Sequence, residues 1–252
     1  YEGRVPGPEI RVSQGARVQR RLINELPQET SVHWHGVRID NAMDGVAGMT
    51  QPPVGVGDSF DYDFNAPDAG TFWYHPHNRT YEQMARGLYG PLIIEEPEPP
   101  QIDAEATLML DDWRLDAEAR IEGGFDRLFD RAHGGRIGNW ITVNGDGRWI
   151  SETASRARLR LRIINAANAR IFDLEARGVS GWIIALDGMP LRQPAPLSRF
   201  TVAPSQRVDL IVDISAEPGG EALLVSHERD GAFALAAWNV TGTKRATALP
   251  AP

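Results

Sequence analysis

The arrangement of apolar and polar residues along the chain favours short β-strands. Phe60, Tyr62 and Phe64 alternate with Asp61 and Asp63, which places the three aromatic rings on one face of an extended segment. Similar β-like runs occur at residues 9–12, 16–23, 88–95, 158–163 and 208–212. Many short strands separated by turn residues predict a β-sandwich or barrel.

Turn and linker signals divide these strands into two series. Residues 95–100 read EEPEPP, and prolines combined with like charges extend a chain rather than fold it. We therefore predict a first domain over residues 1–96, a linker over 97–105 and a second domain over 106–252. The other local predictions are a loop over 40–57, a short helix over 80–85, a loop with some helix over 120–138, and a hairpin turn at Asn144-Gly145.

The two halves look like copies of one β-domain. RRLIN at residues 20–24 matches LRIIN at 161–165, and DG followed by QP at 44–52 is echoed at 187–194. A duplicated domain follows from this pattern. Where the first copy places His33 and His35, the second places Leu174 and Ala176, so only the first domain is expected to bind a metal.

Composition narrows the classes of function. The net charge is -8 without a basic cluster, which argues against nucleic acid as a partner. Cysteine is absent, so disulfides, thiolate metal sites and cysteine nucleophiles are excluded. No apolar run approaches the length of a membrane span, and the first residues carry no secretory pattern.

Four of the 6 histidines form two pairs with one residue between the members. His33 and His35 lie in a predicted strand over residues 31–39, and His75 and His77 in one that starts at Gly70. Residues two apart on a strand share a face, so each pair presents two imidazoles together, as a metal site requires. Imidazole suits zinc, copper, iron and nickel, so the ligand type alone does not name the metal.

These motifs resemble the multicopper oxidases, the laccase-like family built from cupredoxin domains. HWHG at 33–36 followed by WYHPH at 73–77 is the most specific part of the likeness, which covers essentially the whole chain. The resemblance implies an all-β fold of two cupredoxin-like Greek-key β-sandwich domains. Further similar motifs are PGPEI at 6–10, GLYGPL at 87–92, TVNG at 142–145 and ALDG at 185–188.

The resemblance also implies a role for each histidine of the two pairs. In the family, one type 2 copper and a type 3 copper pair form a trinuclear site between the first and last domains. By motif position His33 would bind the type 2 copper, His35 and His75 would share one type 3 copper, and His77 would bind the other. Asp44 falls where family members carry an acid that delivers protons to oxygen, although an aspartate before glycine is equally typical of a turn.

Other candidate residues have simpler interpretations. Trp34, Trp73 and Tyr74 are expected to pack in the core rather than carry electrons. His133 lies in a glycine-rich loop and His227 beside a charged run, so both are expected to be solvated.

The chain departs from the family at its electron entry site. The family's type 1 copper has a cysteine ligand, and this chain contains 0 cysteines, so it cannot build that site. The remaining imidazoles would come from a third cupredoxin domain, and LPAP at 249–252 resembles an interdomain linker. We therefore expect this chain to be the first two domains of a three-domain oxidase and to be inactive alone. The complete parent protein would pass electrons from a phenol or metal ion to dioxygen.

Two alternatives stay open at this level. One is a non-catalytic copper-binding or scaffold protein of cupredoxin descent. The other is an unrelated β-protein that binds zinc through the paired histidines. The resemblance further implies export, in bacteria to the periplasm, and burial of the exposed half-site against another chain would produce an oligomer.

Overall fold

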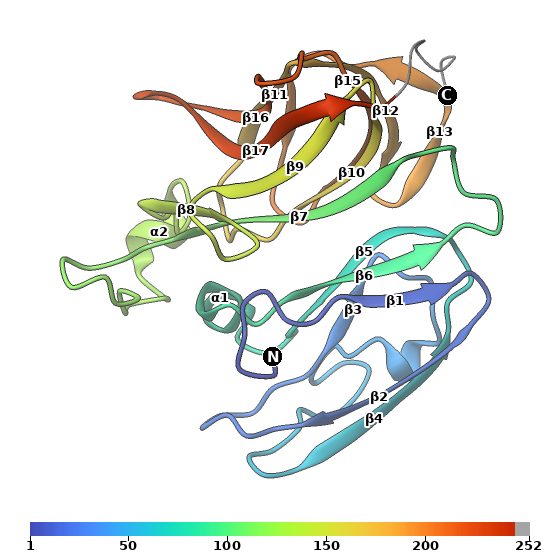
Figure 1. The fold of residues 1–252 in the computed structure, drawn as a ribbon. Coiled ribbons are helices and arrows are strands. Elements are labelled where there is room, and N and C mark those ends of the chain that lie inside the picture. The colour runs from blue at the N-terminus through green and yellow to red at the C-terminus, as the bar shows by residue number, and fades with distance from the viewer. Residues whose placement is uncertain (245–252) are drawn as a thin grey trace. The chain divides into compact units, whose positions relative to one another are not determined.

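The computed structural model describes residues 1–244 and has the predicted all-β architecture, with two sandwich-like units (Figure 1). Unit 1 comprises Tyr1–Pro99 together with Gly123–Arg131. Unit 2 comprises Pro100–Glu122 and the residues from Ala132 onward. The fold class predicted from the alternating pattern and from the resemblance is confirmed.

Unit 1 consists of two β-sheets. A 4-stranded sheet has the order β1-β6-β5-β3, and a 2-stranded sheet pairs β2 with β4 (Figure 1). Its strands are β1 (Ile10–Ser13), β2 (Arg17–Ile23), β3 (His33–His35), β4 (Ser59–Asn65), β5 (Gly70–His75) and β6 (Gly90–Glu95). Its short helices are η1 (Asn41–Met43), α1 (Thr80–Gln83) and η2 (Met84–Arg86).

The core of unit 1 is largely aromatic. Tyr62 and Phe64 of β4 are buried, whereas Asp61 between the aromatics is exposed, as the alternation in this strand predicts. Trp34 packs against both rings, with its centroid 5.4 Å from that of Tyr62 and 4.9 Å from that of Phe64. The residue between the first two histidines therefore anchors β3 in the core, which confirms that Trp34 is a packing residue.

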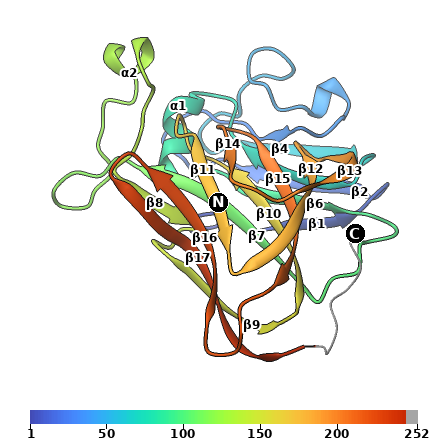
Figure 2. The same cartoon turned by 90° about the horizontal axis from the view of Figure 1, so that it is seen from above.

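Unit 2 also consists of two sheets. The orders are β13-β12-β15-β10-β7-β8 and β14-β11-β16-β17-β9, and Figure 2 shows β16 beside β17. The first sheet contains β7 (Ala104–Trp113), β8 (Trp140–Val143), β10 (Arg158–Asn165), β12 (Val179–Leu186), β13 (Met189–Pro196) and β15 (Arg207–Ile214). The second contains β9 (Trp149–Ser155), β11 (Phe172–Arg177), β14 (Phe200–Val202), β16 (Glu221–Glu228) and β17 (Gly231–Thr243). Helix α2 spans Leu128–Ala132, and all of its residues except Ala132 belong to unit 1.

Every residue of β10 is buried, including its arginines. Leu161 and Ile163 belong to the aliphatic core of unit 2. The neighbouring Arg160 and Arg162 pair with Asp209 of β15 at 2.7 and 3.2 Å, and Arg162 also pairs with Glu105 of β7 at 2.9 Å. A buried charge needs a partner of opposite sign. The alternation in this strand therefore produces one apolar face and one ion-paired face, and neither face is exposed to water.

Several local predictions need correction. The first histidine strand extends only over β3, because Gly36 adopts φ +86° and a turn joins the Val37 N–H to the Trp34 carbonyl. The predicted turn at Asn144-Gly145 is present, with both residues at positive φ. The flanking strands do not continue as a hairpin, since β8 pairs with β7 and β9 pairs with β17.

The predicted domain limits stay a prediction. Strand β7 begins at Ala104, inside the stretch 97–105 expected as a linker. The proposed interdomain linker at 249–252 lies outside the described residues. In the part of the chain that is described, no helix has the length and apolar character needed to cross a bilayer.

An asparagine in each unit supports the internal repeat. The Asn24 side-chain oxygen accepts the Leu26 N–H and its amide donates to the Val54 carbonyl. Asn165 likewise accepts the Ala167 N–H and donates to the Val202 carbonyl. The two matching motifs thus fold into the same local hydrogen-bonded structure.

Candidate metal centre

Strands β3 and β5 bring three histidines together. The two strands are antiparallel, with His33 opposite His75 and His35 opposite Trp73. One ring nitrogen from each of His33, His35 and His75 lies within 4.8 Å of the others. Cross-strand neighbours on one face are close in any antiparallel pair, so strand pairing alone assembles this group.

Backbone carbonyls fix which nitrogen two of these rings present. His33 Nδ1 lies 2.8 Å from the Asp44 carbonyl, and His75 Nδ1 lies 2.9 Å from the Pro76 carbonyl. A carbonyl can only accept, so Nδ1 carries the hydrogen in both rings. The Nε2 lone pair of each neutral ring is left for a metal ion, a pattern typical of metal-binding histidines.

The spacing between His35 and His75 fits a shared metal ion. His35 Nδ1 and His75 Nε2 are 3.1 Å apart. Two imidazole nitrogens that each lie about 2.0 Å from one ion are themselves about 3 Å apart when the angle at the ion is near 100°. Imidazole ligands suit copper, so the residues present fit the copper that the resemblance implies.

Burial keeps His75 neutral. Its side chain is 5% exposed, and burial lowers its pKa to about 3. The Trp73 ring covers it, with the two centroids 4.3 Å apart. Burial also lowers the pKa of His33, partly offset by the hydrogen bond to the Asp44 carbonyl. Neutral imidazole is the metal-binding form, so both rings are ready to bind at neutral pH.

His77 lies at the margin of the group. Its ring centroid is 5.4 Å from that of His33 and 6.4 Å from that of His75, and the residue is exposed. It is not one of the three residues whose ring nitrogens all lie within 4.8 Å of one another. The structure thus brings all four predicted ligands near one another, on β3 and at the end of β5, with three of them close together.

Asp44 contacts His33 in two ways. Its backbone carbonyl accepts the His33 Nδ1–H, and its carboxylate Oδ1 lies 3.3 Å from the same nitrogen. Asp44 also ends helix η1, with its N–H bonded to the Asn41 carbonyl, so the turn interpretation describes its backbone correctly. The carboxylate is 29% exposed and is therefore accessible to solvent beside the centre.

Gly45 holds the Asp44 loop against β3. Its φ is +76°, and a Cβ built on it would lie 1.7 Å from the Val32 carbonyl oxygen. Only glycine allows so close an approach of two backbones at this φ. The DG pair pointed to a turn in the sequence, but its contact with the histidine strand is visible only in the fold.

The remaining histidines lie apart from this group. His133 is exposed, as expected. His227 of β16 is not simply solvated, because its Nε2 lies 2.7 Å from Glu175 Oε2. Glu175 also pairs with Arg177, and these two partners lower its pKa to about 2.

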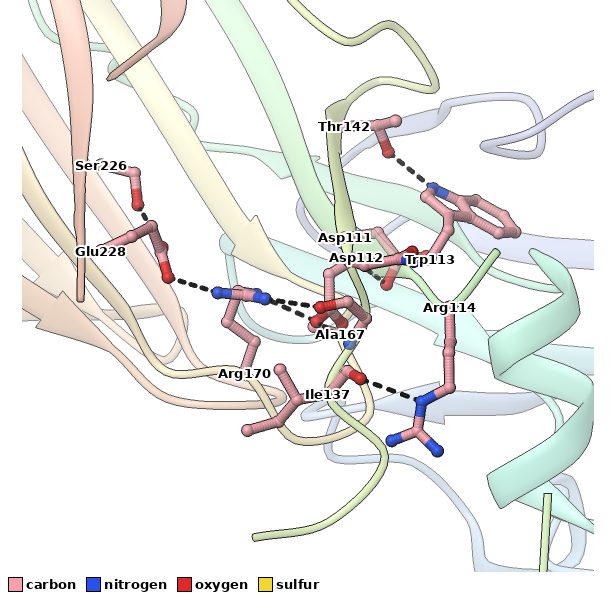
Figure 3. Close-up of polar contacts among 12 residues, drawn as sticks. Asp111, Asp112, Trp113, Arg114, Ile137, Thr142, Ala167, Arg170, Ser226 and Glu228 are labelled. Atoms are coloured by element: carbon pink, nitrogen blue, oxygen red, sulfur yellow. Dashed lines mark hydrogen bonds and ion pairs between the residues drawn. The ribbon is translucent and has the colours of Figure 1, made fainter. Parts of the chain in front are cut away.

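Unit 2 contains a partly buried ion network that no sequence motif indicated (Figure 3). Arg170 donates through Nε to Asp112 Oδ2 at 2.9 Å and pairs with Glu228 through Nη1. Ser226 donates to the other oxygen of Glu228 at 2.8 Å. Burial raises the pKa of Asp112. The network joins the end of β7 to the end of β16, and its residues are too widely separated in the sequence to form a recognisable motif.

Comparisons with known proteins agree with this geometry. The family model described as "Multicopper oxidase" matches residues 1–99. Laccase-1 of Botryotinia fuckeliana is 32% identical over 256 residues, which cover 98% of this chain and 45% of that protein. The chain spans about half the length of the curated relatives it matches.

Solved structures show the same likeness. Lac15 from a marine microbial metagenome is 43% identical, with a TM-score of 0.84 over 98% of this chain and 63% of that one. A multi-copper oxidase from Pseudomonas thermotolerans is 36% identical, with a TM-score of 0.89 over 99% of this chain and 61% of that one.

Proposed function

Because the chain belongs to the multicopper oxidase family, we propose that it supplies the N-terminal copper-binding half of an enzyme that reduces dioxygen to water. The overall reaction consumes one O2, four protons and four electrons taken singly from a reductant, and yields two water molecules. The observation that carries the proposal is the group formed by His33, His35 and His75, whose ring nitrogens lie within 4.8 Å of one another.

We assign His33 to a type 2 copper, His35 and His75 to one type 3 copper, and His77 to the other. The carbonyl partners of His33 and His75 support this assignment, because they leave each Nε2 free as a ligand. When bound, copper ions would supply the one-electron redox chemistry that imidazole and carboxylate side chains do not perform. Burial keeps the His33 and His75 imidazoles neutral, and the carbonyls of Asp44 and Pro76 fix their orientation.

Asp44 is proposed to transfer protons at the centre. Its carboxylate is partly exposed and lies 3.3 Å from His33 Nδ1, so it can take a proton from solvent and present it beside the ligands. The Asp44 backbone carbonyl orients His33 independently of the side chain. Asp44→Asn should therefore lower oxygen turnover and alter its pH profile while leaving copper content unchanged.

The proposed oxidase needs parts from outside this chain. A type 1 copper requires a thiolate, and the sequence has 0 cysteines. We propose that the electron entry site and the remaining imidazoles come from a third cupredoxin domain of a longer parent protein. Residues 1–96 and 106–252, joined by 97–105, would be its first two domains, and this chain alone would not turn over oxygen.

The reductant and the location of the protein follow from the resemblance. A phenol or a low-valent metal ion is the proposed electron donor, and the proposed location is the periplasm or the cell exterior. Both assignments need the parent protein for their test.

The test is oxygen consumption by the longest natural form that contains this chain, loaded with copper. We expect four reductant equivalents to be oxidised for each O2 consumed. Separate His35→Ala and His75→Ala variants should lose turnover, while His227→Ala serves as a control because His227 bonds Glu175 instead. Full copper loading without oxygen consumption would contradict the proposal and favour a non-catalytic copper-binding or scaffold protein.

A further inference from the structure

His77 is the one proposed ligand that does not lie on a paired strand. Strand β5 ends at His75, and the β3–β5 pairing covers only His33–His35. The antiparallel ladder therefore positions three of the imidazoles but stops short of the fourth. Other interactions must hold the His77 backbone near His33.

Hydrogen bonds between two short segments supply that restraint. We call Glu29, Thr30, Ser31, Asn78 and Gln83 the Gln83 network. It joins the residues that lead into β3 with those that follow β5. Glu29 contributes only its backbone carbonyl, which accepts the side-chain amides of Asn78 and Gln83, each at 2.9 Å.

The centre of the network is buried and fully bonded. Gln83 is 0% exposed, and its Oε1 accepts the Thr30 hydroxyl at 2.7 Å. Its Nε2 donates to the Glu29 carbonyl, so both ends of the amide are satisfied. A buried polar network whose members are all paired specifies one arrangement, because any alternative leaves a polar group without a partner.

The network also reaches His77 directly. The His77 N–H donates to Ser31 Oγ at 3.2 Å, and Ser31 is itself 0% exposed. Helix α1, which ends at Gln83, begins three residues beyond His77 and returns a hydrogen bond from Thr80 Oγ1 to the Pro76 carbonyl. His77 and Asn78 are thus attached to the segment that leads into β3, and Pro76 on the other side of His77 is attached to helix α1.

We propose that the Gln83 network positions His77 beside His33 in the metal centre. Its members are positioning residues, since none of them offers a ligand nitrogen to the three-histidine group. The metal-binding consequence rests on the proposed function. The positioning itself is a property of the metal-free chain and can be measured without copper.

The first variant is Thr30→Val, which removes one hydroxyl while keeping the side-chain shape. Thr142→Val is the matched control, because Thr142 of β8 is also buried and its hydroxyl accepts a bond from Trp113 Nε1 at 2.8 Å. In the metal-free protein we expect amide hydrogen exchange at His77 to rise at least about 10-fold in Thr30→Val, with little change at Tyr74 within β5. Thr142→Val should leave both amides as in the wild type.

Copper binding gives a second, separate measurement. Loss of a hydrogen-bond partner that orients a metal-binding side chain weakens metal binding about 10- to 100-fold in characterised sites. A Cu(II) titration should show a loss of this size for Thr30→Val and for Gln83→Leu, but not for Thr142→Val. Both variants break the bond between Thr30 and Gln83, and Gln83→Leu also removes the bond to the Glu29 carbonyl. The double variant should therefore lose little more than Gln83→Leu alone.

The outcomes separate the two proposals. Unchanged His77 exchange in a folded Thr30→Val variant would overturn the positioning role, whatever copper does. If the wild-type chain binds no Cu(II), the proposed function fails, and the exchange data still decide the positioning role. Should Thr30→Val not fold, Ser31→Ala replaces it: changed ¹⁵N shifts of the His77 imidazole support the proposal, and unchanged shifts contradict it.

Discussion

Replacing Gly45 by alanine tests the contact between the Asp44 loop and the histidine strand. Gly45 has φ +76°, and a Cβ there would lie 1.7 Å from the Val32 carbonyl oxygen and 2.5 Å from the carbonyl carbon. Both atoms belong to the backbone, so no side chain can rotate away. The loop or β3 must move by more than 1 Å, roughly the gap between 1.7 Å and an ordinary contact above 3 Å.

The cost has two parts. An alanine at positive φ costs about 1 kcal/mol. Displacement of the loop adds the loss of the hydrogen bond from His33 to the Asp44 carbonyl and of local packing, about 1–3 kcal/mol together. Gly45→Ala should therefore lower the free energy of unfolding by about 2–4 kcal/mol.

Gly48→Ala is the matched control in the same loop. Gly48 has φ +79°, and a Cβ there would meet nothing within 4 Å. Gly48→Ala should lower the free energy of unfolding only by the cost of an alanine at positive φ, about 1 kcal/mol. Urea unfolding of the metal-free chain measures both values, and Cu(II) titration should show weaker binding for Gly45→Ala alone. Equal losses of stability in the two variants would refute the close approach.

Three further predictions concern buried groups. Tyr62→Phe removes the acceptor of the Val32 N–H, 2.8 Å away, and should cost about 1–3 kcal/mol in urea unfolding. Leu224→Ala empties a site that is 0% exposed in unit 2 and should cost about 2–5 kcal/mol in the same assay, so a smaller loss would contradict the tight packing. Burial raises the pKa of Asp112 above 3.8, so the native state binds its proton more tightly than the unfolded state does. The free energy of unfolding of the wild type, relative to that of Asp112→Asn, should therefore fall as the pH rises from about 3.8 through the raised pKa, and should then level off. Urea unfolding at a series of pH values measures this difference. An increase over the same pH range would contradict the prediction.

The histidine group was predictable because it depends on local regularities. Residues two apart on a strand share a face, so His33 and His35 had to point the same way once β3 formed. The aromatic face of β4 follows from the same rule. What the sequence could not show was that β3 is short, because Gly36 ends it through a left-handed φ rather than through a change in polarity.

Long-range contacts account for what the sequence analysis missed. The carbonyl of Asp44 orients His33 across a loop, and Gln83 reaches Glu29 and Thr30 from a different segment. Every residue has a backbone carbonyl, so the sequence cannot indicate which carbonyl accepts a hydrogen bond from a given side chain. The arginines of β10 show the converse case, since an alternating strand looks half-exposed in the sequence although both its faces are buried.

The most direct test of the account is a crystal of this chain loaded with copper and measured by anomalous diffraction at the copper edge. We predict one anomalous peak for an ion bound by His35 Nδ1 and His75 Nε2, and a separate peak at His33. A copper-loaded crystal with its peaks elsewhere, for example at His227 and Glu175, would contradict the assignment of the metal centre.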